Sequence, residues 1–262
     1  MKRLQSRVVL ILQRWWLVLV LIVLWQAMST LGFWKSNLLP SPAQVVQAAL
    51  DMTSSRVLFL DVGASVTRVL CGFIIAAIVG TSLGLLLATY RRAAIPLRNA
   101  IELLRPIPPI AWIPLAILWF GIGNSSAIFI VAMGAFFPIF LNTFEAVSNV
   151  RVAFIKTACC LGANQRLLLT DVLLPAALPE ILVGLRIGLG IAWTTLIAAE
   201  LIGAQSGLGY MIQLNRLTLQ MENVIAGMIV IGLIGVFMNF LIGILQGFVV
   251  PWASDSLRTE TV

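Results

Sequence analysis

The sequence predicts an all-α, polytopic membrane protein. Of its 262 residues, 60% are hydrophobic and 10% are charged, whereas soluble domains carry about 25% charged residues. The uncharged residues gather in runs of roughly twenty, the length that a helix needs to cross a hydrocarbon layer about 30 Å thick. We therefore expect six spanning helices in a single transmembrane domain, residues 1–262.

The first predicted span covers residues 15–34. It follows a basic start, as a signal peptide would, but the apolar run is too long and no clean cleavage site follows. Tryptophans at both ends (Trp15, Trp16 and Trp34) are typical of interfacial anchors. A capping box, Ser41-Pro42-Ala43-Gln44, then predicts a short amphipathic helix on the membrane surface, ending near Met52.

The second predicted span covers residues 69–90, with Gly80 and Gly84 as a close-packing face. The next uncharged run, 106–144, is too long for one helix. Glycines 121 and 123 divide it into spans 106–121 and 126–147, with Asn124, Ser125 and Ser126 expected in the turn between them. Four prolines in the first of these either line a wet cavity or kink the helix for packing.

The fifth and sixth predicted spans cover residues 178–202 and 223–250. Arg186 and Glu200 lie at opposite ends of the fifth, about 21 Å apart, so they do not pair within that helix. Ionisable groups in a span usually serve a function. We expect Arg186 to snorkel or to bind the polar loop before it, and Glu200 to hold an outer gate or cap the following loop.

That following loop contains Gly207-Leu208-Gly209 and then Tyr210, Met211, Gln213 and Asn215. Gly207, Gly209 and Met211 are candidates for an outer gate, and an ordinary lipid-facing re-entry is the alternative. We find no internal sequence repeat, and its absence argues against an inverted-repeat carrier.

The charges predict the orientation. Thirteen Lys and Arg residues lie in the N-terminal segment, 90–105, 148–186 and the tail (Arg258). Four lie on the other side: Lys35, Arg56, Arg68 and Arg216. The positive-inside rule places the thirteen, and both termini, in the cytoplasm. The sequence has no histidine and no Walker A loop, and its three cysteines lack metal spacing, so we expect no catalytic, metal or cofactor site. No pattern for nucleic-acid binding occurs.

One polar stretch, within residues 148–177, therefore forms a cytoplasmic loop. Ser148 or Asn149 would cap a helix that runs to Cys160, Gly162 would form an elbow, and Asn164 would cap a second helix ended by Pro175. Such a knob can insert into a groove on a partner, and an ordinary connecting loop is the alternative. Its candidate contacts are Phe154, Ala158 and Leu161, with the basic Lys156 and Arg166 at the edges.

The spacing in this loop resembles the EAA loop of ABC-importer permeases: Glu-Ala-Ala, three residues, Gly, nine residues, Ile-x-Leu-Pro. Here Lys156-Thr157-Ala158 precede Gly162 by the same three residues, and Val172-Leu173-Leu174-Pro175 close the pattern. Lys156 reverses the charge of the family glutamate, so no salt bridge made by that glutamate is carried over. Further motifs resemble the nitrate/sulfonate/taurine branch: Leu39-Pro40-Ser41-Pro42, Arg105-Pro106-Ile107-Pro108, Ala111–Leu115, Trp119–Gly123, Gly184-Leu185-Arg186 and Ala198–Leu201.

This resemblance implies a division of labour in a bacterial inner (plasma) membrane. Two permease subunits, which are usually identical in this family, would form the translocation path. Two cytoplasmic ATPases bind ATP-Mg, and a periplasmic or lipid-anchored binding protein delivers the solute. The loop would be the two-helix coupling loop between spans four and five. The implied solute is a small anion (nitrate, sulfonate or taurine, cyanate, bicarbonate), with a neutral vitamin precursor, or a carrier without an ATPase, as alternatives.

Overall fold

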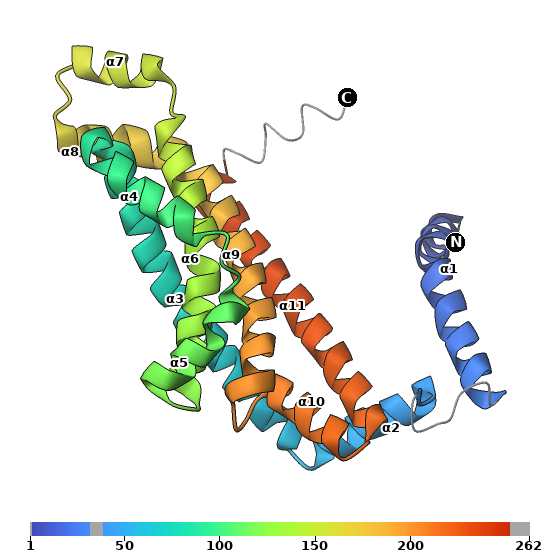
Figure 1. Cartoon of the computed structure of the whole chain (residues 1–262). Coiled ribbons are helices and arrows are strands. Elements are labelled where there is room, and N and C mark those ends of the chain that lie inside the picture. The colour runs from blue at the N-terminus through green and yellow to red at the C-terminus, as the bar shows by residue number, and fades with distance from the viewer. Residues whose placement is uncertain (1, 32–38, 252–262) are drawn as a thin grey trace. The chain divides into compact units, whose positions relative to one another are not determined.

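The computed structural model describes residues 2–31 and 39–251, apart from the side chains of 2–15 and 91–95. Every regular element in these ranges is helical, which confirms the predicted fold class. The predictions for Trp34, Lys35 and Arg258 lie outside the described residues. The elements are α1 (Lys2–Thr30), α2 (Pro42–Ser54), α3 (Val57–Thr89), α4 (Arg91–Leu104), η1 (Pro109–Trp112), α5 (Ile113–Phe120), α6 (Asn124–Ser148), α7 (Val152–Cys160), α8 (Gln165–Leu167), η2 (Leu168–Leu173), α9 (Leu174–Gly203), α10 (Leu208–Leu217) and α11 (Met221–Val249) (Figure 1).

Four helices of the described chain are long and apolar enough to cross a membrane: α3, α6, the continuous helix 165–203, and α11. A fifth span arises only if a bent pair of helices, 96–104 and 109–120, counts as one. The apolar part of α1, Trp16–Thr30, is shorter. The chain is thus polytopic, and the number six stays a prediction.

The predicted third span, 106–121, is not one helix. Its residues form the short 3₁₀ turn η1 and the eight-residue helix α5, and the axis turns by 89° from the end of α4. The cause is the proline run, because Pro106, Pro108 and Pro109 have no N–H to continue an α-helix. The turn predicted at 121–126 is shorter than expected: Gly121 ends α5, and Asn124, Ser125 and Ser126 already belong to α6.

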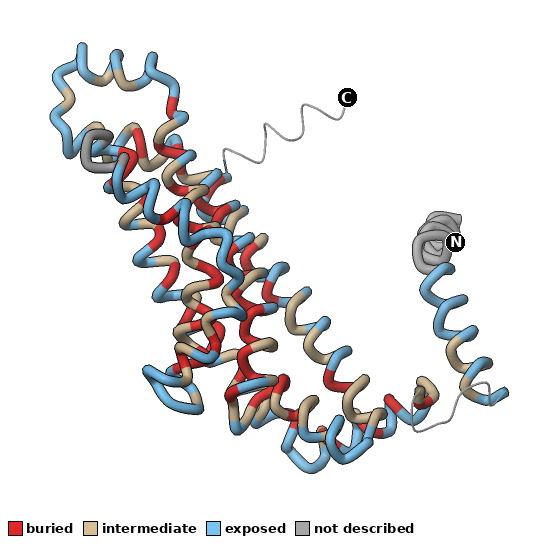
Figure 2. The backbone as a smooth tube through the Cα atoms, in the orientation of Figure 1, coloured by how far each residue is buried: buried red, intermediate tan, exposed pale blue. Residues whose placement is uncertain are grey.

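The contacts divide the chain into two units, residues 1–60 with 211–231, and residues 61–210 with 232–262. The core of the second unit is the pairing of α6 with α9. Half of the most apolar window is buried in each of these helices, against 28% in α3 and 11% in α11. Figure 2 shows the red, buried positions concentrated along α6 and α9. The apolar sides of α3 and α11 remain exposed, as expected of helices that meet lipid or another apolar partner.

Small residues let α3 approach α6, as predicted for Gly80 and Gly84. A Cβ on Gly84 would lie 2.8 Å from Cβ of Thr143, and one on Gly80 would lie 3.1 Å from Cγ2 of Ile139. The same contact extends to Gly72, where a Cβ would lie 2.6 Å from Cγ1 of Val131. Close backbone approach is the usual basis of helix association in membranes.

The first unit contains the predicted surface helix. The capping box of α2 is present: Ser41 Oγ accepts from the N–H of Gln44, and the Gln44 side chain accepts from the N–H of Ser41. Trp25 Nε1 donates to the carbonyl of Pro40 at 3.1 Å, which ties α1 to the start of α2. In the same unit Met211 is buried, and a Cβ on Gly227 would lie 2.7 Å from its Cε.

Replacing Gly72 by alanine is expected to lower the midpoint of thermal unfolding in detergent, since the new methyl meets Val131 and the carbonyl of Ile128. Overpacking of this kind costs about 1–3 kcal/mol. Gly63→Ala on the same helix is the matched control, because no atom lies within 4 Å of its Cβ position and alanine favours helix. Equal effects of the two substitutions would contradict the close contact.

Candidate functional sites

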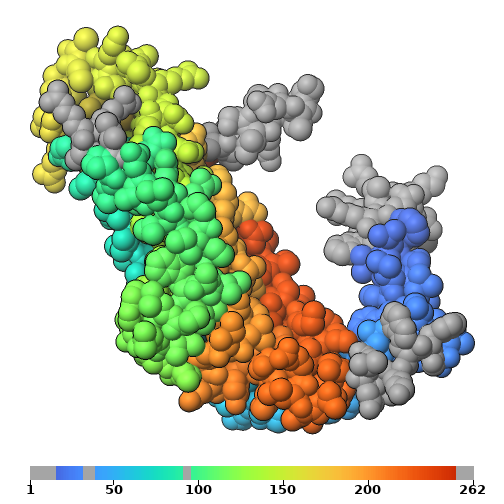
Figure 3. All heavy atoms as spheres, viewed as in Figure 1, coloured from blue at the N-terminus to red at the C-terminus, as the bar shows by residue number. Residues whose placement is uncertain are grey.

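The predicted coupling loop, residues 148–177, lies at one end of α6 and α9 (Figures 1 and 3). Ser148 ends α6, and Leu174 begins α9, so both ends of the loop are fixed by long helices. Ile155 packs against a buried cluster that includes Val147, Val150 and Leu173. The loop is therefore held to the helix ends by Ile155 of α7, by Leu168 and Leu169 of η2, and by its own two termini.

The elbow between the two short helices has the predicted glycine geometry. Gly162 has φ +83°, its N–H donates to the carbonyl of Cys159, and the N–H of Ala163 donates to the carbonyl of Ala158. These two bonds form a Schellman motif, which satisfies the last carbonyls of α7. Asn164 then caps α8, as predicted, through a 2.8 Å bond from the N–H of Leu167 to Oδ1.

Two other predictions for this loop were wrong. Neither Ser148 nor Asn149 caps α7, because both belong to the end of α6 and the residue before α7 is Arg151. Pro175 does not end the second helix: α8 continues through the π-helical turn η2 into α9. Pro175 cannot donate to the carbonyl of Asp171, but its fixed φ suits the first turn of a helix, so it begins α9 instead.

The outward face of α7 is apolar and exposed, and the helix has no buried residue. Leu161 is 83% exposed and Phe154 is 51% exposed, while Ala158 is half-buried. Figure 2 shows this helix largely in pale blue. Lys156, Thr157 and Arg166 are exposed beside it. All the predicted contact residues except Pro175 thus lie on α7, the elbow or α8, and Pro175 lies at the start of α9.

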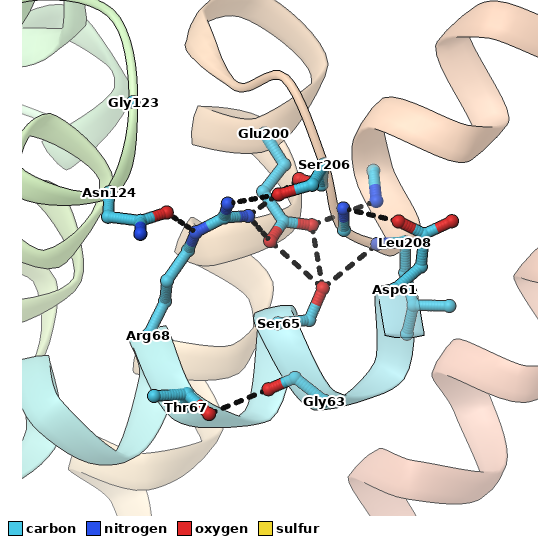
Figure 4. A network of polar contacts seen from close by, with 12 residues as sticks. Asp61, Gly63, Ser65, Thr67, Arg68, Gly123, Asn124, Glu200, Ser206 and Leu208 are labelled. Carbon is cyan, nitrogen blue, oxygen red and sulfur yellow. Dashed lines mark hydrogen bonds and ion pairs between the residues drawn. The ribbon is translucent and has the colours of Figure 1, made fainter. Parts of the chain in front are cut away.

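The second site is a polar cluster formed by Asp61, Ser65, Arg68, Asn124, Glu200 and Ser206 (Figure 4). Ser65, Arg68 and Glu200 are buried, Asp61 and Ser206 are half-buried, and Asn124 is exposed at its edge. Asp61, Ser65 and Arg68 lie on one face of α3, because they are spaced four and three residues apart. Glu200 comes from the end of α9, and Asn124 begins α6. At about 1.5 Å per residue, Glu200 lies roughly 39 Å along α9 from Leu174, so the cluster is at the end of the helix opposite the coupling loop.

Arg68 and Glu200 form a buried ion pair. Nη1 of Arg68 lies 2.6 Å from Oε1 of Glu200, and the two residues are 4% and 1% exposed. The other donors of Arg68 are also bonded: Nε donates to Oδ1 of Asn124, Nη1 to the carbonyl of Ser206, and Nη2 to Oγ of Ser206. Since these bonds use the guanidinium on all sides, the group is not available to bind a solute.

The acidic groups of the cluster hold the start of α10. The N–H of Gly207 donates to Asp61, that of Leu208 to Oγ of Ser65, and that of Gly209 to Oε2 of Glu200, at 2.8, 2.9 and 2.9 Å. The first N–H groups of a helix have no partner within it, and the helix dipole favours negative charge there. Glu200 therefore caps the following loop, one of the two roles expected for it.

Gly207 and Gly209 are needed because the backbone passes directly over Glu200. Gly207 has φ +107°, and a Cβ there would lie 2.3 Å from Oε1 of Glu200. A Cβ on Gly209 would lie 2.7 Å from Cβ of Glu200. The two glycines and Glu200 come together as a group, whereas Met211 is buried in the other unit of the chain.

Arg186 does not bind the coupling loop. Its Nε donates to Oδ1 of Asn239 at 2.7 Å, so it links α9 to α11 instead. The sequence reasoning missed Asp61, Ser65, Arg68, Asn124 and Ser206, because it began the second span at residue 69 and counted Arg68 as a loop charge. The spacing of Asp61, Ser65 and Arg68 on one helical face was the signal that could have found them.

The sequence matches the family model described as binding-protein-dependent transport system inner membrane component over residues 80–255. It is 36% identical to the putative aliphatic sulfonates transport permease protein of Bacillus subtilis, over 90% of this chain and 86% of that one. It is 37% identical to the taurine transport system permease protein of Escherichia coli, over 90% of this chain and 88% of the relative. The nitrate import permease protein of Synechocystis is 31% identical, over 89% and 87% of the two chains.

The fold is similar to that of a chain of the MetNI methionine ABC transporter, solved in inward-facing conformations. The TM-score is 0.63 at 21% identity, and the match covers 76% of this chain and 97% of that chain. At this identity the likeness concerns the fold.

Arg68→Met is expected to lower the free energy of unfolding by about 3–5 kcal/mol, since it leaves the Glu200 carboxylate buried without its partner. Arg68→Met combined with Glu200→Gln should recover part of the loss because both charges are then removed. The measurement is thermal or denaturant unfolding in detergent, with Arg216→Met at the end of α10 as the control for lost charge. A double variant less stable than the single one would contradict a dominant ion pair.

Proposed function

We propose how this chain works from the premise that it belongs to the family of inner membrane components of binding-protein-dependent transport systems. It is a permease component of an ABC importer. In our proposal it forms the translocation path for a small solute, which an extracytoplasmic binding protein delivers and which ATP hydrolysis on a separate subunit drives inward. The proposed coupling to an ATPase rests on one observation, the exposed apolar face of α7 beside the glycine elbow.

The proposed docking element is α7 with the elbow. An exposed leucine and an exposed phenylalanine on a short helix are suited to a hydrophobic groove on a partner. The Schellman motif and the Asn164 cap fix the angle between α7 and α8. Movement of the groove would therefore pass through α8 and η2 into α9. Lys156 would face the partner with a positive charge, where the family pattern has a glutamate.

The proposed orientation places the coupling loop in the cytoplasm and both termini with it. The thirteen Lys and Arg residues on that side support it. The polar cluster, at the other end of α9, would then lie on the extracytoplasmic side. There it would hold the loop 204–207 and the start of α10 as a fixed platform, close to where a binding protein arrives.

The proposed solute is a small oxyanion or a related sulfonate. The named substrates of the relatives, aliphatic sulfonates, taurine and nitrate, support this class. Two permease subunits, two ATPases and one binding protein would make up the importer. A neutral vitamin precursor remains the alternative solute in the same machine.

Leu161→Asp is expected to abolish co-elution of the permease with its co-expressed ATPase, while leaving the permease folded. The side chain is 83% exposed, so a charge there disturbs no internal packing, whereas a charge in a hydrophobic groove costs about 2 kcal/mol or more. The control is Leu219→Asp, also exposed at 69% but in the turn after α10. Wild-type co-elution of the Leu161 variant would remove α7 as the docking element, and absence of any co-elution with wild type would favour a carrier without an ATPase.

The orientation is tested by the exposed cysteines Cys159 and Cys160 at the end of α7. In a Cys71→Ala background, a membrane-impermeant maleimide is expected to label them in inside-out vesicles and to leave them unlabelled in intact spheroplasts. A variant that lacks all three cysteines measures the background. Labelling from the outside only would reverse the proposed topology.

A further inference from the structure

We propose that a cavity between α4, α6 and α9 is a passage site for a small zwitterion, with Arg105 facing its anionic group and Glu145 its ammonium group. This proposal rests on the proposed import function and narrows its solute. The cavity has a volume of about 430 Å³, within the range of small-molecule sites. Its polar lining side chains are Arg105, Asn142 and Glu145, and its apolar lining includes Pro109, Pro138 and Ile187.

Prolines border the cavity on two sides: at the break after α4, and at Pro138 inside the continuous helix α6. At the break after α4, Pro106 and Pro109 have no N–H, so the carbonyls of Glu102 and Arg105 have no α-helical donor. In α6, Pro138 likewise cannot donate to the carbonyl of Gly134. Interrupted backbone at membrane depth occurs where it is buried in protein or lines a water-filled cavity. The break after α4, whose residues Arg105, Ile107 and Pro109 line the cavity, fits this rule.

Among the residues that the structure describes, the two charged side chains of the cavity, Arg105 and Glu145, have no ion-pair partner. Arg98–Glu102 and Arg68–Glu200 are the ion pairs of the described chain, and neither includes Arg105 or Glu145. Nor does a side chain of the described residues hydrogen-bond either group. Arg68, in contrast, has all its sides occupied, so Arg105 is the guanidinium of a cavity that remains open to a solute. An Arg fork binds carboxylate, sulfonate or phosphate oxygens well.

Glu145 decides between a simple anion and a zwitterion. Two like charges close together near a protein surface repel, so nitrate or a plain sulfonate would be repelled at the Glu145 end. A solute with an ammonium group would instead gain an ion pair there. Asn142 can add one amide N–H for the anionic end, because its Nδ2 uses one hydrogen on the carbonyl of Pro138, at 2.8 Å.

The position of the cavity suits passage. Its α6 residues run from Gly134 to Glu145, and its α9 residues are Ile187 and Ile191, all between the polar cluster and the coupling loop. A site of this kind needs only weak affinity, because a solute must leave it on the inner side. We therefore expect dissociation constants in the millimolar range, about −4 kcal/mol.

The test uses the full-length permease purified in detergent and saturation-transfer NMR with 2-aminoethanesulfonate (taurine), ethanesulfonate and ethylammonium. The wild type is expected to bind taurine about tenfold more tightly than either half-molecule, since a hydrogen bond to a charged group contributes about that factor. Arg105→Gln should remove the binding of taurine. Glu145→Gln should weaken the binding of taurine and strengthen the binding of ethanesulfonate, so that the preference for taurine over ethanesulfonate disappears.

Two variants control for lost charge outside the cavity. Arg98→Gln removes a cation from the same helix as the cavity's break, and Glu180→Gln removes an exposed carboxylate from α9. Both should bind taurine like the wild type. Equal affinity for taurine and ethanesulfonate, no binding of either, or unchanged binding by Arg105→Gln would overturn the proposal. Binding is measured without the ATPase, so these results stand apart from the co-elution test of the proposed import function.

Discussion

The structure depends on the ion pair between Arg68 and Glu200. Taking two charges out of water costs several kcal/mol for each ion, and only a fully bonded arrangement offsets that cost. Here each group has partners on every side, and those partners come from α3, α6, the loop after α9 and the start of α10. Because an unpaired charge in this place is so unfavourable, the four segments can separate only together. The pair thus fixes one end of the α3, α6 and α9 group as a unit.

At the other end of the same helices, the coupling loop is held mainly by local bonds instead of a buried ion pair. The coupling loop is built from local backbone bonds, a glycine elbow and one asparagine cap. Ile155 of α7 packs against the buried cluster at the helix ends, whereas Phe154 and Leu161 stay exposed and available to a partner. One helix, α9, joins the rigid end to the exposed end. A chain that transmits a movement across a membrane needs both an exposed surface, where the movement begins, and a rigid region, against which it acts.

The sequence was sufficient for what local chemistry decides. The uncharged runs predicted α3, α6, α9 and α11, and the capping box at Ser41 predicted α2. Gly162 and Asn164 predicted the elbow. It was insufficient where tertiary partners decide. Asp61 and Arg68 were left outside the second span, which was predicted to begin at residue 69, yet α3 extends through them because Glu200 and the N–H groups of α10 neutralise them. Likewise Pro175 was read as a stop, but a π-helical turn before it lets the helix continue.

The continuity through Pro175 gives the molecule a lever. From Gln165 to Gly203 the chain is a single helical rod of 39 residues, roughly 55 Å long. A tilt of about 5° at the coupling end would move the far end by roughly 5 Å, close to one helical turn. The π-helical turn η2 lies near the coupling-loop end of this rod, and its widened backbone is the part of the rod that bends most readily. In the proposed importer, a small rotation of a docked partner would thus become a larger displacement of the Glu200 cluster, which moves as one body, without any segment of the rod unfolding.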